Sequence, residues 1–399
     1  MADGTREFHV RQRNRTPARE PFPLPPPLQR MLDLGKATLA APFKGVTADG
    51  TATPGLFRLE KTGHSLQPVV DAARAFLMSM PPDQRATARF DLSSPMWQAW
   101  CNIHPFMMRH GICLADLGGE QRERALALMR ASMSESGYRT ACDVMKLNGH
   151  VLEFTNRPDE YGEWLYWVSI MGEPSGSTPW GWQIDGHHLI VNCFVLGDQM
   201  VLTPNFMGSE PVHASTGKFA GTTVFAEEER KGFVLMSAFT PEQRAQATLG
   251  LKLPFDVMTT AFHDNDVMPY QGVRYGDMSK EQRDLLERLI GLYTGRIRPG
   301  HAEIRYAEAK RHLDDTWFAW IGPCDDVSAF YYRVHSPAIL IEFDHQPGIV
   351  YDNDEHTRNH VHTIVRTPNG NDYGKDLLRL HYAQQDHADP RSPHRQGKA

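Results

Sequence analysis

Apolar residues recur at helical spacing in several long segments of the chain. Between residues 65 and 78 they lie three or four positions apart, at Leu66, Val69, Val70, Ala73 and Phe76. This spacing is typical of a helix with one buried face. Comparable patterns and helix-start signals predict further helices at residues 28–41, 119–145, 226–249, 279–297 and 375–381.

Shorter segments rich in aromatic and β-branched residues predict strands. They lie at residues 164–171, 316–321, 330–334, 338–344 and 360–366. Residues 187–203 predict a hairpin, because Gly197-Asp198 interrupts two apolar runs. Strands in the middle and at the end, with helices before and between them, favour an α+β fold. We expect a mainly antiparallel β-sheet built from central and C-terminal strands and packed with helices.

Four short segments share the ending Gln-Arg after one acidic residue. They are Pro82-Asp-Gln-Arg85, Gly119-Glu-Gln-Arg122, Pro241-Glu-Gln-Arg244 and Lys280-Glu-Gln-Arg283. Each is typical of a helix start, and two of them follow a Thr or Ser that completes a capping box. An internal duplication would also explain the likeness. Because the spacing between the segments is irregular, we interpret them as similar helix starts rather than as a repeat.

Composition adds limits on the class of protein. The 399 residues are 41% hydrophobic and 23% charged, with a net charge of −6, as in an ordinary globular protein. The slight acidity argues against nucleic acid or an anionic membrane as partner. No apolar run approaches the roughly 18 residues of a membrane span. Five scattered cysteines without a C-x-x-C motif suit a reducing compartment, so we expect a cytoplasmic protein.

The same features divide the chain into three parts. Residues 1–27 form a proline-rich N-terminal arm, residues 28–385 a single α+β domain, and residues 386–399 a polar tail. The sequence leaves open whether the protein forms a homo-oligomer.

The stretch from Trp180 to Phe194 concentrates polar and aromatic residues in one predicted strand. Alternation along a strand puts His188 on the face of Ile190 and Asn192, and His187 on the other. A buried polar ring without a partner costs about 1–3 kcal/mol. At least one of the two histidines should therefore bind a carboxylate, a carbonyl or a metal ion.

A second stretch near the C-terminus supplies more ligand types. His360 and His362 point the same way from one strand, about 7 Å apart, and Glu342 lies on the strand before. Imidazole and carboxylate are the usual ligands of zinc, iron and manganese. We therefore expect a divalent metal ion, namely zinc, iron or manganese, held by His188, His360, His362 and Glu342. The alternative for Glu342 is a salt bridge to Arg333 or Arg366.

Several neighbours are candidates for roles beside the metal. Asp185 could orient a histidine ring, and His187 could exchange roles with His188 or face the substrate. Arg366 could bind a substrate oxyanion or pair with Asp372, and Tyr373 could act as a general acid. The expected catalytic set is therefore Asp185, His187, Arg366 and Tyr373.

The expected substrate-binding residues are aromatic or polar residues on or beside these strands, and four of the five have a structural alternative. For Trp180 and Trp182 the alternative is an aromatic core, and for Asn371 and Asp372 it is a tight turn. The expected set is Trp180, Trp182, Asn192, Asn371 and Asp372.

Together the two stretches resemble a family of unknown function, DUF3500, over about residues 30–385. The matching residues are Trp180-Gly-Trp182, Gly186-His-His188, Asn192, Pro204-x-Phe206-x-Gly208, Tyr332-Arg333, Glu342-Phe-Asp344, His360-x-His362 and Arg366-x-Pro-Asn-Gly-Asn-Asp-Tyr-Gly374. The resemblance implies no activity, so the functional hypothesis rests on the residues.

The leading hypothesis is a metal-dependent enzyme that acts on a small organic molecule, by hydrolysis with a metal-bound water. A non-haem iron oxygenase would use the same histidines. A non-catalytic binding protein, with a structural metal or a hydrogen-bonded histidine core, is the alternative from another class. Metal-free acid–base catalysis by His188 with Asp185 or Glu342 is the weakest alternative.

Overall fold

The computed structural model describes residues 9–11, 24, 26–103 and 108–388. This part of the chain forms one sheet of thirteen strands, in which only the pairs β1–β3 (Arg89–Phe90, Tyr166–Met171) and β8–β10 (Thr248–Gly250, Trp317–Ile321) are parallel. The α+β fold with a mainly antiparallel sheet is confirmed.

The helices of the described residues are α1 (Pro26–Ala40), α2 (Gln67–Met78), α3 (Pro82–Ala88), α4 (Gly119–Ser132), α5 (Glu135–Thr155), α6 (Ala226–Ser237), α7 (Pro241–Ala247), α8 (Lys280–Thr294), α9 (His301–Lys310) and α10 (Lys375–Ala388). The remaining strands are β2 (Ile112–Cys113), β4 (Trp180–Gly186), β5 (Leu189–Leu196), β6 (Gln199–Val201), β7 (Asn205–Ser209), β9 (Val273–Arg274), β11 (Tyr331–His335), β12 (Leu340–Pro347) and β13 (His356–Arg366).

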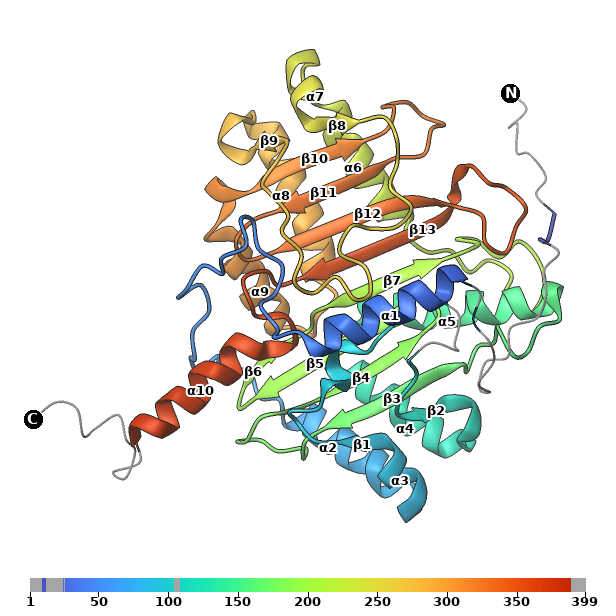
Figure 1. Ribbon diagram of the computed structural model, residues 1–399, viewed down its shortest axis with the longest axis vertical. Helices are drawn as coiled ribbons and strands as arrows, with labels where there is room; N and C mark the ends of the chain where they lie inside the picture. The colour runs from blue at the N-terminus through green and yellow to red at the C-terminus, as the bar shows by residue number, and fades with distance from the viewer. Residues whose placement is uncertain (1–8, 12–23, 25, 104–107, 389–399) are drawn as a thin grey trace, which may run out of the picture.

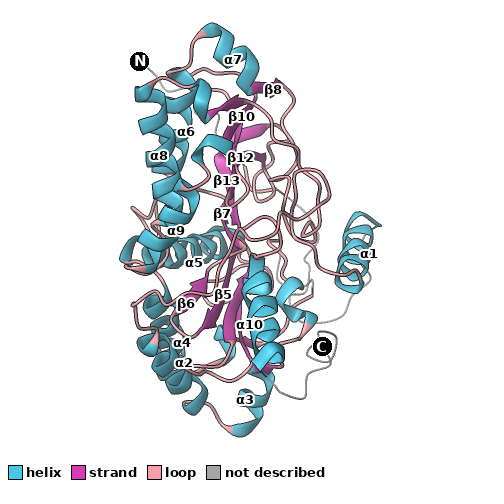
Figure 2. Ribbon diagram, turned by 90° about the vertical axis from the view of Figure 1, so that its left-hand side faces the viewer, coloured by secondary structure: helices cyan, strands magenta, loops and turns pink. Residues whose placement is uncertain are grey.

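The two faces of the sheet are covered differently (Figures 1 and 2). Helices α2, α4, α5, α6, α8 and α9 lie on one face, whereas α1 and long connecting loops lie on the other. Strand alternation follows this division. Leu189, Val191 and Cys193 belong to the large core cluster under the helices, and Ile190 and Phe194 to a second cluster under the loops. The faces expected for these strand residues are therefore correct.

The chain repeats one arrangement of elements twice, which corrects our interpretation of the four Gln-Arg segments. The strand order β1-β3-β4-β5-β7 in the first half is mirrored by β8-β10-β11-β12-β13 in the second, and the halves meet at the antiparallel pair β7–β13. The first half runs α2, α3, β1, β2, α4, α5, β3, and the second half runs α6, α7, β8, β9, α8, α9, β10. The edge strands β1 and β8 pair in parallel with β3 and β10, and the short strands β2 and β9 pair with the same two strands in antiparallel. The four segments start α3, α4, α7 and α8, so they form two equivalent pairs.

Equivalent side-chain contacts support the duplication. Gln121 on α4 donates to Ser79 O at 3.1 Å and to Gln84 Oε1 at 2.8 Å. In the second half, Gln282 on α8 donates to Ala238 O at 2.8 Å and to Gln243 Oε1 at 2.8 Å. Each glutamine also caps its own helix. The likeness of the segments thus reflects a shared contact as well as a shared helix start.

Two predicted helices are each split in the structure. The segment expected at 119–145 consists of α4 and α5, which separate at Met133 and Ser134, where Ser134 caps α5. The segment expected at 226–249 consists of α6 and α7, which separate before Thr240 and Gln243, the residues of a capping box. In both cases a side-chain cap lets a new helix start within an otherwise helical pattern.

The ends of the chain are described only in part. Within the proposed arm, residues 9–11 are described and lie on the segment 348–354, with Val10 bridged to Tyr351. The rest of the arm up to residue 23 lies outside the described residues. At the other end α10 continues to Ala388, beyond the predicted 381, and the tail from 389 is not described. Among the described helices, none is long and apolar enough to cross a membrane.

Candidate metal centre

His188 lies in a two-residue hairpin turn, not inside a strand as expected. Gly186 pairs with Leu189, so His187 and His188 form the turn between β4 and β5. His188 adopts a left-handed conformation with φ 63°, which is uncommon for a residue other than glycine. Its backbone is held by two hydrogen bonds, from its N to Asn102 O at 3.0 Å and from Gly208 N to its O at 2.8 Å.

His360 and His362 project from the same, loop-covered face of β13, as the alternation predicted. His362 pairs with Gly208 on β7 and with Asp344 on β12. A Cβ at Gly208 would lie 2.7 Å from His362 Cδ2 and 3.4 Å from His188 Cδ2. The absence of a side chain at Gly208 therefore lets the two imidazoles approach each other.

The three histidines bring their Nε2 atoms together. His360 Nε2 lies 3.2 Å from His188 Nε2 and 3.1 Å from His362 Nε2, and all three residues are buried. Three nitrogens bound to one ion at about 2.0–2.1 Å stand roughly 3 to 3.4 Å apart for angles between octahedral and tetrahedral. The spacing thus matches one face of a metal coordination sphere.

The far nitrogens of two rings are held by oxygen acceptors. His360 Nδ1 lies 2.7 Å from Pro347 O, and His362 Nδ1 lies 2.7 Å from Asp256 Oδ1. Both Nδ1 atoms therefore carry the proton, and both Nε2 atoms present a lone pair. The pKa of His360 is lowered to about 3, mainly by burial and to a smaller extent by the neighbouring His362. His360 therefore stays neutral at ordinary pH.

Asp256 and Asn102 were missed by the sequence reasoning. Burial opposes ionisation of Asp256, but His362 and hydrogen bonds from Thr260 and Asn102 hold its pKa below the ordinary value. Asn102 donates to Asp256 Oδ2 at 3.1 Å, while its carbonyl accepts from the His188 backbone. Both residues lie in loops that no spacing rule connects to the histidines.

Asp344 forms a second candidate grouping with Asp256 and His362. Asp344 is fully buried, and burial, together with the charges of Asp256 and Glu342, raises its pKa well above the ordinary value. Asp344 is therefore a neutral acid beside the ionised Asp256. Asp256 is therefore the ionised carboxylate of this grouping.

The centre faces a cavity of about 920 Å³. His187, His188, His360 and His362 all line it. Its other walls come from α1, from the loop at residues 254–263 and from the end of β12. A ligand in this cavity would have direct access to the three nitrogens.

The structure does not bring Glu342 to the histidines. Its carboxylate accepts from Met258 N at 2.7 Å, from Thr259 N at 2.9 Å and from Tyr331 OH at 2.7 Å, and also from the Thr259 hydroxyl. With these donors Glu342 anchors the loop that carries Asp256. The expected role of Glu342 as a metal ligand, and its alternative salt bridge, both disagree with this geometry.

Arg366, Asp372 and Tyr373 form a buried structural network away from the cavity lining. Arg366 Nη1 lies 2.8 Å from Asp264 Oδ1 and 3.0 Å from Asp372 Oδ2, and it also donates to two loop carbonyls. The Tyr373 hydroxyl meets Asp264 at 3.1 Å. Of the two alternatives for Arg366, the ion pair with Asp372 is the one observed, and Tyr373 is not placed to act on a substrate at the histidines.

Asp185 also serves the fold rather than a histidine ring. Its Oδ1 lies 2.6 Å from Arg109 Nη1, and the same guanidinium donates to Cys101 O and Ile103 O. Asp185 thereby fixes the loop that carries Asn102. Metal-free catalysis by His188 with Asp185 or Glu342 does not fit these contacts.

The expected substrate-binding residues are structural in their contacts. Trp180 and Trp182 are fully buried on the helix side and donate to Ser175 O and Ser132 Oγ. Asn192 donates to Pro204 O. Asn371 Oδ1 accepts from Leu377 N, at the start of α10. None of these residues lines the described wall of the histidine cavity.

His187 is the expected catalytic residue that does reach the cavity. Its ring stacks on His188 with centroids 4.0 Å apart, and its Nδ1 lies 2.9 Å from Asn148 Oδ1. A donating Nδ1–H leaves Nε2 as the basic nitrogen.

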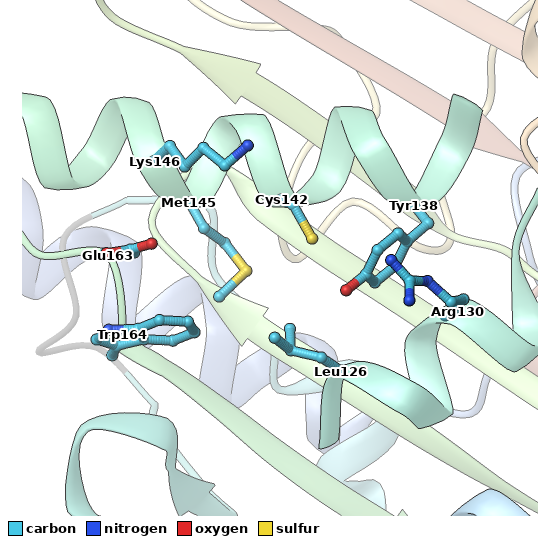
Figure 3. Close-up of a pocket in the computed structure, with 8 residues that line it drawn as sticks. All are labelled: Leu126, Arg130, Tyr138, Cys142, Met145, Lys146, Glu163 and Trp164. Carbon is cyan, nitrogen blue, oxygen red and sulfur yellow. The ribbon is translucent and has the colours of Figure 1, made fainter. Parts of the chain in front are cut away.

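A separate hollow of about 270 Å³ lies on the helix side (Figure 3). Tyr138, Cys142 and Lys146 from α5 and Leu126 and Arg130 from α4 line it. It shares no lining residue with the histidine cavity.

Comparison with known proteins finds one family. No curated protein and no solved structure matches the chain. A family profile described as "Protein of unknown function (DUF3500)" matches residues 62–375, a span that contains the three histidines and Asp256. The chain therefore belongs to the DUF3500 family.

Proposed function

We propose that His188, His360 and His362 hold a divalent metal ion, and that the protein is a metal-dependent enzyme that hydrolyses a small organic molecule. The 3.1 Å contact between His360 Nε2 and His362 Nε2 carries the proposal. Because both Nδ1 atoms face acceptors, two lone pairs face each other. A cation between the nitrogens turns this repulsion into ligation.

The charge of the ligand set favours hydrolysis over oxygenase chemistry. Three neutral imidazoles would not neutralise any of the positive charge of a bound ion. An ion with this ligand set lowers the pKa of bound water to about 7. The usual non-haem iron oxygenase site has two histidines and one carboxylate. Here the nearest charged carboxylate, Asp256, binds His362 Nδ1, and Glu342 binds a loop.

The position of the cavity favours an enzyme over a structural metal site. Structural zinc sites are closed by four protein ligands, whereas catalytic sites keep an open position. The three histidines line a cavity of about 920 Å³, which leaves the open side of the ion toward a ligand.

Residues of the chain would support the reaction without binding the ion. Asp256 keeps His362 in the required tautomer and increases its basicity. We assign His187 the role of proton acceptor at Nε2, because it lines the same cavity and its Nδ1 faces Asn148.

We also place the protein in the cytoplasm. The five cysteines are free thiols, which suits a reducing compartment.

Elemental analysis tests the proposal. We expect near-stoichiometric zinc, iron or manganese in the wild type, and loss of metal in His188→Ala and in the double variant His360→Ala/His362→Ala. The exposed His64→Ala should keep the metal. Equal metal content in all of these folded proteins, or none in the wild type after reconstitution, would contradict the proposal.

Screening for hydrolysis of neutral esters with and without oxygen then tests the reaction class. Turnover that is independent of oxygen and lost in His188→Ala supports hydrolysis. A strict requirement for oxygen would instead support the oxygenase alternative.

A further inference from the structure

The walls of the histidine cavity are apolar away from the metal centre. Leu28 and Met31 of α1 line the cavity together with Ile103, Phe255, Val257 and Ile349 from other parts of the chain. Amide and hydroxyl groups from Asn102, Thr260 and Gln346 also line the cavity. Such a division suits a ligand with one polar end and one apolar end.

Phe255 shows that the apolar wall extends to solvent. Its side chain is 73% exposed, although it directly precedes Asp256, the partner of His362. Pro254 and Val257, its neighbours, also line the cavity. A large exposed apolar ring at the edge of a cavity is typical of a surface that a ligand covers.

The charged groups on the described wall are already paired. Arg11 Nη2 lies 2.9 Å from Asp354 Oδ1 and also donates to Gly348 O. His263 Nδ1 lies 2.7 Å from Asp266 Oδ2. Among the described lining residues, Arg11 is the only arginine or lysine. An anionic group on the distant end of a substrate would therefore find no unpaired cation on this wall and would lose its hydration.

We infer that the substrate is an uncharged ester or lactone with an alkyl or aryl group that lies along the apolar wall. This inference rests on the proposed function. In the reaction, water adds to the carbonyl carbon, the acyl–oxygen bond breaks, and the leaving oxygen takes a proton from the attacking water. An ester gives an alcohol and a carboxylic acid, and a lactone gives one hydroxy acid. The acid group ionises at neutral pH and is then poorly matched to the apolar wall.

Metal-chelating probes of different tails test this inference on the full-length protein. Cobalt(II) is substituted into the centre, and its visible spectrum reports binding of acetohydroxamic, octanohydroxamic and suberic monohydroxamic acid. The first two differ in tail length, and the third has a carboxylate in place of the terminal methyl of the longer tail. Each buried methylene contributes about fourfold in affinity.

Octanohydroxamic acid has six more methylenes than acetohydroxamic acid, and we expect it to bind at least about 100-fold more tightly, which corresponds to burial of three or four of them. The suberic probe should bind at least about tenfold more weakly than the octanoyl probe. Met31→Lys adds a cation on α1 and should narrow or reverse the difference in affinity between the octanoyl and suberic probes. Phe255→Ala should lower the affinity of the two long-tailed probes only.

Two different failures are distinguishable. Bound cobalt with equal affinity for the short and long tails, or with preference for the carboxylate tail in the wild type, would overturn this inference alone. A folded protein that binds no cobalt would overturn the proposed function, and the inference with it.

Discussion

Asp256 Oδ1 lies 2.7 Å from His362 Nδ1, although the two residues are 106 positions apart in the sequence. A loop from the second repeat thus fixes the tautomer of a histidine on the last strand. Such carboxylate partners orient histidine ligands and increase their basicity.

Replacing Asp256 should therefore weaken metal binding without removing a ligand. We expect Asp256→Asn to lower the metal affinity about 10- to 100-fold, measured by competition with a chelator of known affinity. Asp354→Asn, at the edge of the same cavity, is the matched control and should bind metal like the wild type. Equal affinities for the wild type and Asp256→Asn would contradict this role.

Gly208 should be intolerant of any side chain. The Cβ of Gly208→Ala would meet His362 Cδ2 and Val361 O, both at 2.7 Å, and overpacking of this kind costs about 1–3 kcal/mol. We expect loss of most metal binding together with lower stability in chemical denaturation. Gly250→Ala on β8, where the new Cβ meets nothing within 4 Å, should change neither. Normal metal content in Gly208→Ala would show that the rings are packed less closely.

Arg366 should be needed for stability and not for metal binding. Its guanidinium is fully buried and binds Asp264, Asp372 and two loop carbonyls. Lysine keeps the charge but cannot make all of these bonds, and each lost bond costs about 1.5–3 kcal/mol. We expect Arg366→Lys to unfold at much lower denaturant concentration and, while folded, to keep its metal. A stable Arg366→Lys with altered affinity for anionic ligands would instead restore the substrate-binding hypothesis.

Asp372 should make stability depend on pH. Burial, opposed by Arg366, raises its pKa to about 6 from an ordinary value of 3.8. Because the folded-state pKa is the higher one, this contribution is fully present below about pH 4 and is lost as the pH rises through 6. The lost stability is on the order of 2–3 kcal/mol.

Denaturation of the wild type and Asp372→Asn, with a chelator present, measures this contribution. The free energy of unfolding of the wild type, minus that of Asp372→Asn, should fall as the pH rises from 4 to 6 and should stay constant above pH 6. If this difference instead grows with pH in the same range, Asp372 ionises more easily in the folded protein than in the unfolded one.

The repeated glutamine contact should have the same energetic role in both halves. Gln121→Ala and Gln282→Ala each remove a helix cap and a bridge to the preceding helix. We expect both to destabilise the protein by about 1–3 kcal/mol, measured by thermal unfolding beside the exposed Gln29→Ala. A large effect in one half and none in the other would argue against equivalent contacts.

The strand pattern was sufficient to predict part of the site. Period-two alternation placed His360 and His362 on one face of their strand, and both line the histidine cavity. The sequence also pointed to His188, although its position in a turn was not predicted. Gly186-His-His188 lacks the Asn-Gly signature of tight hairpins, and His188 itself adopts the positive φ.

The sequence could not predict which buried polar residues bind one another. Arg366 and Asp264 lie 102 positions apart, and Asp185 and Arg109 lie 76 apart. The loops that bring them together have no periodic pattern, so a buried carboxylate on the correct face, such as Glu342, could not be distinguished from a ligand. The duplication was missed because its two halves repeat pairs of segments rather than one segment at a constant period.

The most direct test of the metal centre is a crystal structure with anomalous diffraction data collected at the absorption edge of the metal found in the purified protein. We expect one anomalous peak about 2.0–2.2 Å from the Nε2 atoms of His188, His360 and His362, with Asp256 still bound to His362 Nδ1. A well-ordered site without a peak, or a peak held by other residues, would contradict a metal centre at these histidines.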